Sequence, residues 1–198
     1  MTRAKVPIAV FVSGRGRTLV NLAAQIEAGA LPARIALVVG SKACDATTWA
    51  IERRIATEIA PRLAVEDVER LVREHGVHWI VLAGYIKHLP IPTSMRGRIV
   101  NIHPALLPKF GGKGMYGHRV HQAVLDSCET ESGCTVHYVD DVYDHGDVIA
   151  QVRCAVEAGD TPETLAARVF ALECALYPRV LAELFAEKAL GTRDQALG

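Results

Sequence analysis

An asparagine and a histidine stand two positions apart in the segment Asn101-Ile102-His103-Pro104. The apolar run over residues 98–102 predicts a strand. Because side chains alternate along a strand, we expect Asn101 and His103 on one face and Ile102 on the other. An amide N–H beside an imidazole suits acyl transfer, since both can stabilise an oxyanion and the imidazole can move a proton. Alone, such a pair more commonly marks a hydrogen-bonded histidine at a strand end.

An acidic loop, residues 140–147, carries four aspartates in eight positions. A carboxylate from this loop near His103 would raise the pKa of the imidazole and could hold a water for proton relay. Calcium binding is a weak competitor, because the spacing is not that of an EF-hand loop. A solvated turn is the alternative interpretation.

A glycine-rich loop connects the first predicted strand to the first predicted helix: Ser13-Gly14-Arg15-Gly16-Arg17-Thr18. Its backbone N–H groups and the helix N-terminus favour an anion, and the two arginines could clamp a phosphate. The loop lacks the dinucleotide and Walker patterns, because Leu19 follows and no Gly-Lys-Thr/Ser is present. A tight turn with Thr18 as the N-cap is the alternative.

A second glycine-rich segment, residues 108–117, has four glycines in ten positions and could act as a lid over the site. His118 and His121 follow on a predicted helix and could face a common ligand. We predict no metal site there, because no acidic or cysteine ligand has matching spacing.

Strands and helices alternate through the first half of the chain. Strands are predicted over 7–12, 34–39, 55–60, 79–83 and 98–102, and helices over 18–28, 45–54 and 65–75. This order predicts an α/β fold with a mainly parallel sheet, whose ligands bind at the carboxyl ends of the strands. Strands over 133–139 and 147–156 predict an antiparallel extension. A helix over 161–190 should be kinked or split at Pro178, and 191–198 is a predicted disordered tail after one domain, 1–190.

The composition sets outer limits on function. The 198 residues suit one domain, and 22 basic against 22 acidic residues give no excess for nucleic acid. The apolar run over 79–83 is far shorter than the roughly 20 residues of a membrane helix. The five cysteines are odd in number and form no CxxC pair, which is typical of free thiols in a reducing cytosol. We expect a cytoplasmic protein without signal peptide, metal, membrane or nucleic-acid partner.

Together, these segments resemble the phosphoribosylglycinamide formyltransferase family over residues 6–184. The resemblance is carried by the Ser-Gly-x-Gly loop, residues 81–89, the stretch NIHPALLPK at 101–109, and residues 133–139 leading into Tyr143-Asp144-His145-Gly146. It implies a single-domain, Rossmann-like formyltransferase fold. It further implies transfer of a formyl group from the co-substrate 10-formyltetrahydrofolate to the amine of glycinamide ribonucleotide.

The resemblance also implies roles for individual residues. Asn101, His103 and Asp144 match the catalytic residues: the first two stabilise the oxyanion, while Asp144 keeps His103 charged and positions a proton-carrying water. Glu173 matches a residue near the acceptor amine, although a helix glutamate facing solvent is the alternative. Residues 13–18 match the segment that binds the phosphate and ribose of the acceptor. Two stretches match the folate-binding segments: Tyr85, Ile86, Lys87, His88 and Leu89, and Asp140, Asp141, Val142 and Tyr143.

The chain departs from the family in two places. Family members commonly carry Asn and Ser where Arg15, Arg17 and Thr18 stand, which leaves open a changed acceptor or binding mode. Residues 111–117 are also longer than the usual turn and resemble a subgroup with GGKGMYG. Monomer and homodimer remain alternatives.

Three other functions compete with this interpretation. A formyltetrahydrofolate deformylase uses the same Asn-His-Asp set with water as acceptor, but usually adds an N-terminal domain, which we do not expect because the first strand begins near residue 7. Methionyl-tRNA formyltransferases add a tRNA-binding domain that 198 residues cannot hold, and the neutral charge argues against tRNA. A non-catalytic folate or nucleotide sensor would not need all three catalytic residues.

Overall fold

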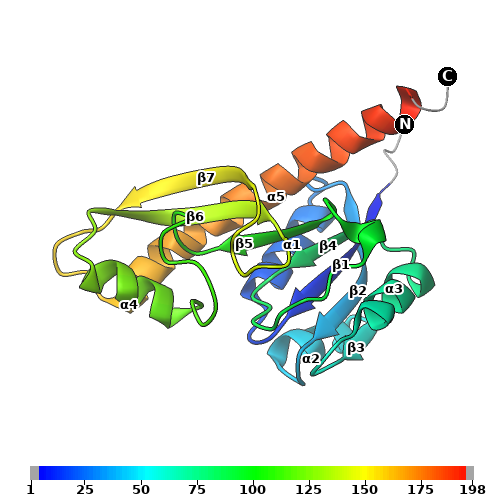
Figure 1. Ribbon diagram of the computed structural model, residues 1–198, viewed down its shortest axis with the longest axis horizontal. Coiled ribbons are helices and arrows are strands. Elements are labelled where there is room, and N and C mark those ends of the chain that lie inside the picture. The colour runs from blue at the N-terminus through cyan, green and yellow to red at the C-terminus, as the bar shows by residue number, and fades with distance from the viewer. Residues whose placement is uncertain (1–4, 195–198) are drawn as a thin grey trace.

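The structure, a computed structural model, describes residues 5–194. Within them, seven strands form one sheet in the order β3-β2-β1-β4-β5-β6-β7 (Figure 1). The strands are β1 (Val6–Val12), β2 (Ala33–Gly40), β3 (Thr57–Ile59), β4 (Trp79–Leu82), β5 (Ile99–His103), β6 (Glu131–Tyr138) and β7 (Val148–Ala155). The helices are α1 (Arg17–Glu27), α2 (Asp45–Glu52), α3 (Val65–Glu74), α4 (His118–Asp126) and α5 (Pro162–Asp194), with a short 3-10 helix at Thr93–Met95.

The sheet is parallel from β3 to β5 and antiparallel from β5 to β7. The predicted α/β class and antiparallel extension are therefore confirmed. The chain builds outward from β1 through β2 to β3, then returns to place β4 on the other side of β1. The carboxyl ends of β1 and β4 thus form the topological switch point, where open α/β sheets bind their ligands.

Alternate side chains of the strands belong to two separate cores. Ile8, Val10 and Val12 of β1 pack in one core with residues of α1 and α5. Ala9 and Phe11 point to the opposite face, where residues of α3 complete the second core. Burial on both faces explains why these parallel strands are nearly continuous apolar runs.

Helix α5 is not split at Pro178, contrary to one of the two predicted outcomes, and Figure 1 shows it as one uninterrupted helix. Proline lacks an N–H, so the carbonyl of Cys174, four residues earlier, loses its helical partner. The side chain of Asn21 on α1 donates a hydrogen bond to that carbonyl at 3.0 Å. The flanking Leu176, Tyr177 and Val180 are buried in the core, which anchors the helix on both sides of Pro178.

The position where α5 ends can be compared with the predicted disordered tail, residues 191–198. The helix continues through residues 191–194, and residues 195–198 lie outside the described part of the chain. The domain boundary at 190 remains a prediction. No helix within 5–194 has the length and apolar character to cross a membrane.

Tyr177 joins α5 to the two strands that carry the site. Its side chain is 0% exposed, and its hydroxyl lies 3.0 Å from the carbonyl oxygens of both Leu82 and Val100. We expect Tyr177→Phe to lower the free energy of unfolding by about 1–3 kcal/mol, because it removes a buried donor from two carbonyls. Urea unfolding measures this. The exposed Tyr116→Phe is the control, with an expected change within about 0.5 kcal/mol; equal effects of the two substitutions would contradict the prediction.

Candidate active site

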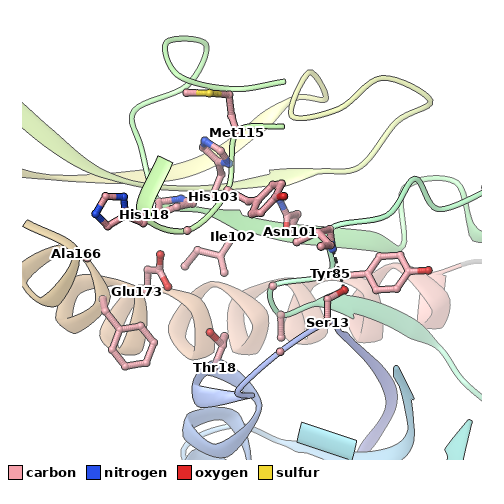
Figure 2. Close-up of a pocket in the computed structure, with 18 of the residues that line it drawn as sticks. Ser13, Thr18, Tyr85, Asn101, Ile102, His103, Met115, His118, Ala166 and Glu173 are labelled. Carbon is pink, nitrogen blue, oxygen red and sulfur yellow. Dashed lines mark hydrogen bonds between the residues drawn. The ribbon is translucent and has the colours of Figure 1, made fainter. Parts of the chain in front are cut away.

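A cavity of about 520 Å³ lies at the switch point of the sheet. Its walls come from the loop after β1, the segment after β4, the end of β5, the glycine-rich segment and the first half of α5. Figure 2 shows Asn101 and His103 on one side of this space, with Thr18 and Glu173 on the other. A smaller pocket of about 50 Å³ adjoins it. The two share four lining residues, Tyr85, Asn101, Tyr143 and Asp144.

The structure brings together the three predicted catalytic side chains. Asn101 Nδ2 donates a hydrogen bond of 3.4 Å to Asp144 Oδ1. His103 Nδ1 lies 3.5 Å from Asp144 Oδ2. Ile102 contributes to the core on the α1 and α5 side of the sheet, so the predicted alternation along β5 places Asn101 and His103 together. The set stands where the two cavities meet.

Backbone groups of the glycine-rich segment complete the surroundings of His103 and Asp144. The imidazole Nε2–H of His103 donates to the Phe110 carbonyl oxygen at 2.8 Å, and the Gly112 N–H donates to Asp144 Oδ2 at 3.0 Å. Both Phe110 and Asp144 have left-handed backbones, with φ of 57° and 53°. For a bulky residue such as Phe110 this conformation is an outlier, and such outliers cluster at functional sites. The segment predicted as a lid is therefore bonded to the site; its movement stays a prediction.

His137 belongs to the same cluster, although it was not among the predicted site residues. It pairs with Asn101 across β5 and β6. Its Nδ1–H donates to the Tyr138 carbonyl at 2.8 Å, so its Nε2 accepts from Asn101 Nδ2 at 3.0 Å. This bond takes one N–H of the Asn101 amide and leaves the other directed to Asp144 Oδ1. The sequence signal was the alternation of residues 133–139, but the register that selects His137 depends on strand pairing.

The electrostatics of the cluster favour a neutral His103 beside an ionised Asp144. Burial lowers the pKa of His103; Asp144 and the Phe110 carbonyl raise it, His137 lowers it, and the net shift is downward. Burial raises the pKa of Asp144, but the nearby His137 and His103 and the Gly112 N–H bring it below its usual value. Asp144 therefore raises the pKa of His103, as predicted, although burial outweighs this effect; the charge of His103 during the reaction stays a prediction.

The loop after β1 lines the larger cavity with all six of its predicted residues. Gly16, not Thr18, is the N-cap of α1; its φ is 76°, and a Cβ there would lie 2.6 Å from the Cβ of Ala46. Only glycine fits both constraints. Ser13, labelled in Figure 2, is buried. Its Oγ accepts hydrogen bonds from the Ser41 hydroxyl at 2.7 Å and the Ile86 N–H at 3.1 Å. These bonds tie the loop to the segment after β4.

The two predicted folate-binding stretches face each other across the smaller pocket. His88 Nε2 donates to the Asp141 carbonyl at 3.1 Å, and the rings of His88 and Tyr143 meet edge to face at 5.5 Å. Lys87, His88, Leu89, Asp140 and Val142 line this pocket, and Tyr85 and Tyr143 line both cavities. Ile86 lines only the larger one. Asp141 lines neither, because its carboxylate pairs with Arg96 on the surface at 3.0 Å.

Glu173 lines the larger cavity and is partly buried, so the alternative of a glutamate facing solvent is wrong. Burial raises the pKa of Glu173 to about 7, and the charge of Arg17 opposes that rise. A carboxyl that titrates near neutral pH can either accept or donate a hydrogen bond to a ligand in the cavity.

His118 and His121, the two histidines of α4, lie in different environments. His118 is exposed and bonds Glu163 at 3.0 Å. His121 is buried, and its Nδ1 has no hydrogen-bond partner among residues 5–194. Burial, together with the charges of His118, His103 and Arg17, lowers the pKa of His121 to about 4. No cluster of three or more metal-binding side chains occurs in the described part of the chain.

His121 should make the protein less stable in mild acid. The unfolded histidine takes up a proton near pH 6.5, whereas the folded one does so near pH 4. The free energy of unfolding should therefore decrease as the pH falls through this window, by about 3 kcal/mol from His121. Urea titrations from pH 7 to pH 4 should show a flatter decrease for His121→Asn. Parallel pH profiles for the two proteins would refute this assignment.

Comparisons with known proteins identify similar sequences and a shared fold. The formyl transferase family model matches residues 6–181. The chloroplastic phosphoribosylglycinamide formyltransferase of Arabidopsis thaliana is 38% identical over 198 residues, covering 94% of this chain and 68% of that protein. The phosphoribosylglycinamide formyltransferase structure from Bacillus halodurans has 31% identity and a TM-score of 0.82, covering 92% of this chain and 96% of that one.

A second kind of enzyme shares the fold. The structure of a formyltetrahydrofolate deformylase from Pseudomonas syringae pv. tomato has 25% identity and a TM-score of 0.77, covering 91% of this chain and 61% of that one. The likeness thus extends over formyl-folate enzymes with different acceptors. From the family match over residues 6–181, the chain belongs to the formyl transferase family.

Proposed function

We propose that the protein transfers the formyl group of 10-formyltetrahydrofolate to the amine of glycinamide ribonucleotide. One observation carries the proposal: Asn101 and Asp144 line both cavities, with His103 beside them. The smaller pocket lies between the predicted folate stretches, and the larger cavity includes the predicted phosphate loop and Glu173. A formyl carbon delivered from the first side would meet an amine held on the second.

The transfer would begin with attack of the amine on the formyl carbon. The Asn101 Nδ2–H that bonds Asp144 Oδ1 at 3.4 Å in the free protein would turn to the oxyanion of the tetrahedral intermediate, and the positive charge gained by His103 would stabilise that oxyanion electrostatically. His103 is neutral beforehand, so its Nδ1, the nitrogen that faces Asp144, would take up the proton that the attacking amine loses. A water held by Asp144 would then carry this proton to the folate nitrogen as the bond between carbon and that nitrogen breaks, which returns His103 to its neutral form.

The residues around the trio would prepare it for this step. The Phe110 carbonyl and Asp144 lie at opposite nitrogens of His103, which stabilises the imidazolium once it forms. His137 orients the amide of Asn101. The ribonucleotide phosphate would bind the loop of residues 13–18, and Glu173 would accept the amine end of the acceptor.

The remaining predictions concern partners and location. We propose that both substrates are small molecules and that no metal takes part. A cytoplasmic location, the absence of nucleic-acid and membrane partners, and the choice between monomer and homodimer stay predictions. The Arabidopsis relative is named as chloroplastic.

Absorbance of the folate product tests the function directly. The purified protein is mixed with 10-formyltetrahydrofolate, with and without glycinamide ribonucleotide. Product that forms only with the ribonucleotide supports the transferase. Product at the same rate without it indicates a deformylase, and no product in either mixture would overturn the proposed reaction.

A further inference from the structure

Arg17 and Arg15 differ in how they are held. Arg17 is the first residue of α1, and its guanidinium carbon lies 3.9 Å from the ring centroid of Phe170 on α5. A guanidinium plane stacks well on an aromatic face, which restricts a side chain that is otherwise mobile. Both arginines are exposed, but Arg15 has no comparable stacking partner in the described part of the chain.

The stacked guanidinium belongs to the larger cavity. Arg17, Phe170 and Glu173 all line it, and Glu173 follows Phe170 by about one turn of α5. No carboxylate lies within ion-pair distance of Arg17 among the described residues. Arg17 acts electrostatically on Glu173 but forms no direct ion pair with it, so its guanidinium can still meet an anionic ligand in the cavity.

We propose that Arg17, stacked on Phe170, is the side chain by which this protein selects a phosphorylated acceptor, and that Phe170 positions it. The inference rests on the proposed function. A planar guanidinium donates two parallel hydrogen bonds to a phosphate, and stacking leaves its N–H edges free to do so. Because Phe170 restricts the side chain before the ligand arrives, less conformational entropy is lost on binding.

The test compares two acceptors, glycinamide ribonucleotide and its dephosphorylated ribonucleoside, at saturating 10-formyltetrahydrofolate. The readout is the ratio of their kcat/KM values. Arg17→Gln should lower this ratio about tenfold or more, because a charge-assisted bidentate contact is lost. Phe170→Leu should lower it about fivefold through KM for the ribonucleotide. The KM for the folate should not change in either variant.

Matched controls separate selection from general damage. Phe185→Leu makes the same change on α5 at a residue that packs against Trp79, outside both cavities. Arg179→Gln removes an exposed arginine that forms an ion pair with Glu183 at 3.3 Å. Both should leave the acceptor ratio unchanged, and circular dichroism verifies that each variant is folded.

Each result decides between definite alternatives. A lower ratio in Arg17→Gln with an unchanged one in Phe170→Leu would overturn the positioning role, and an unchanged ratio in both would overturn the whole inference. If the wild type formylates neither acceptor, the proposed function fails, and calorimetry with ribose 5-phosphate against ribose then tests this inference alone. Weaker binding of ribose 5-phosphate to both variants would support it; equal binding to all three proteins would refute it.

Discussion

Replacing Asn101 by alanine is expected to lower kcat about a hundredfold or more without unfolding the protein. The substitution removes the Nδ2–H that lies at the junction of the two cavities, within 3.4 Å of Asp144 Oδ1. Oxyanion donors act mainly in the transition state, so kcat should fall more than KM rises. His103→Ala should give a loss of similar size.

A second substitution separates the donor from the volume of the side chain. Asn101→Asp keeps the shape but provides no N–H when ionised, so it should be about as inactive as the alanine variant. Gln122→Ala is the matched control, because this exposed amide on α4 donates a hydrogen bond to Asp126 at 2.8 Å and lies outside both cavities. Steady-state kinetics and circular dichroism give the measurements. Near-normal turnover in both Asn101→Ala and His103→Ala would refute the mechanism.

The sequence predicted those features of the site that depend on residues close together along the chain. Asn101 and His103 share a face because they are two apart on one strand, and the glycines after β1 mark the switch-point loop. Asp144 was found through its family motif. By contrast, His137 reaches Asn101 through the antiparallel register of β5 and β6, which the alternation of either strand alone does not specify.

Other contributions could not be read from residue types. The Phe110 carbonyl and the Gly112 N–H act through the backbone, so their side chains carry no signal for the contacts with His103 and Asp144. The charges around His103 are visible in the sequence, whereas the burial that lowers its pKa appears only in the fold. Similarly, Pro178 predicts a break by local rules, and tertiary contacts override it through Asn21.

Asp144→Asn is expected to lower kcat strongly and to lower the pKa of His103 still further. The carboxylate is the main group that raises the pKa of this buried imidazole, so its loss leaves burial opposed only by the Phe110 carbonyl. The imidazolium that forms during transfer would also lose its counter-charge at Nδ1. We expect a loss of about a hundredfold or more, comparable to that of Asn101→Ala.

The pH dependence gives this prediction a readout independent of turnover. In the wild type, the NMR titration of His103 should have its midpoint below pH 6.5, and in Asp144→Asn the midpoint should move lower. Asp144 itself has a lowered pKa, so it stabilises the wild-type fold above about pH 3.8, and this contribution is lost as the pH falls through its folded pKa. The variant should lack that acid-sensitive contribution.

Asp147→Asn serves as the matched control, because this aspartate lies in the same loop, lines neither cavity and carries the same charge. It should leave the His103 midpoint where it is in the wild type. A midpoint unchanged in Asp144→Asn would mean that the 3.5 Å approach of the two side chains has no electrostatic effect on His103. Asp144 would then serve only to hold the water and the Gly112 N–H, and the stabilisation of the imidazolium would have to come from the Phe110 carbonyl alone.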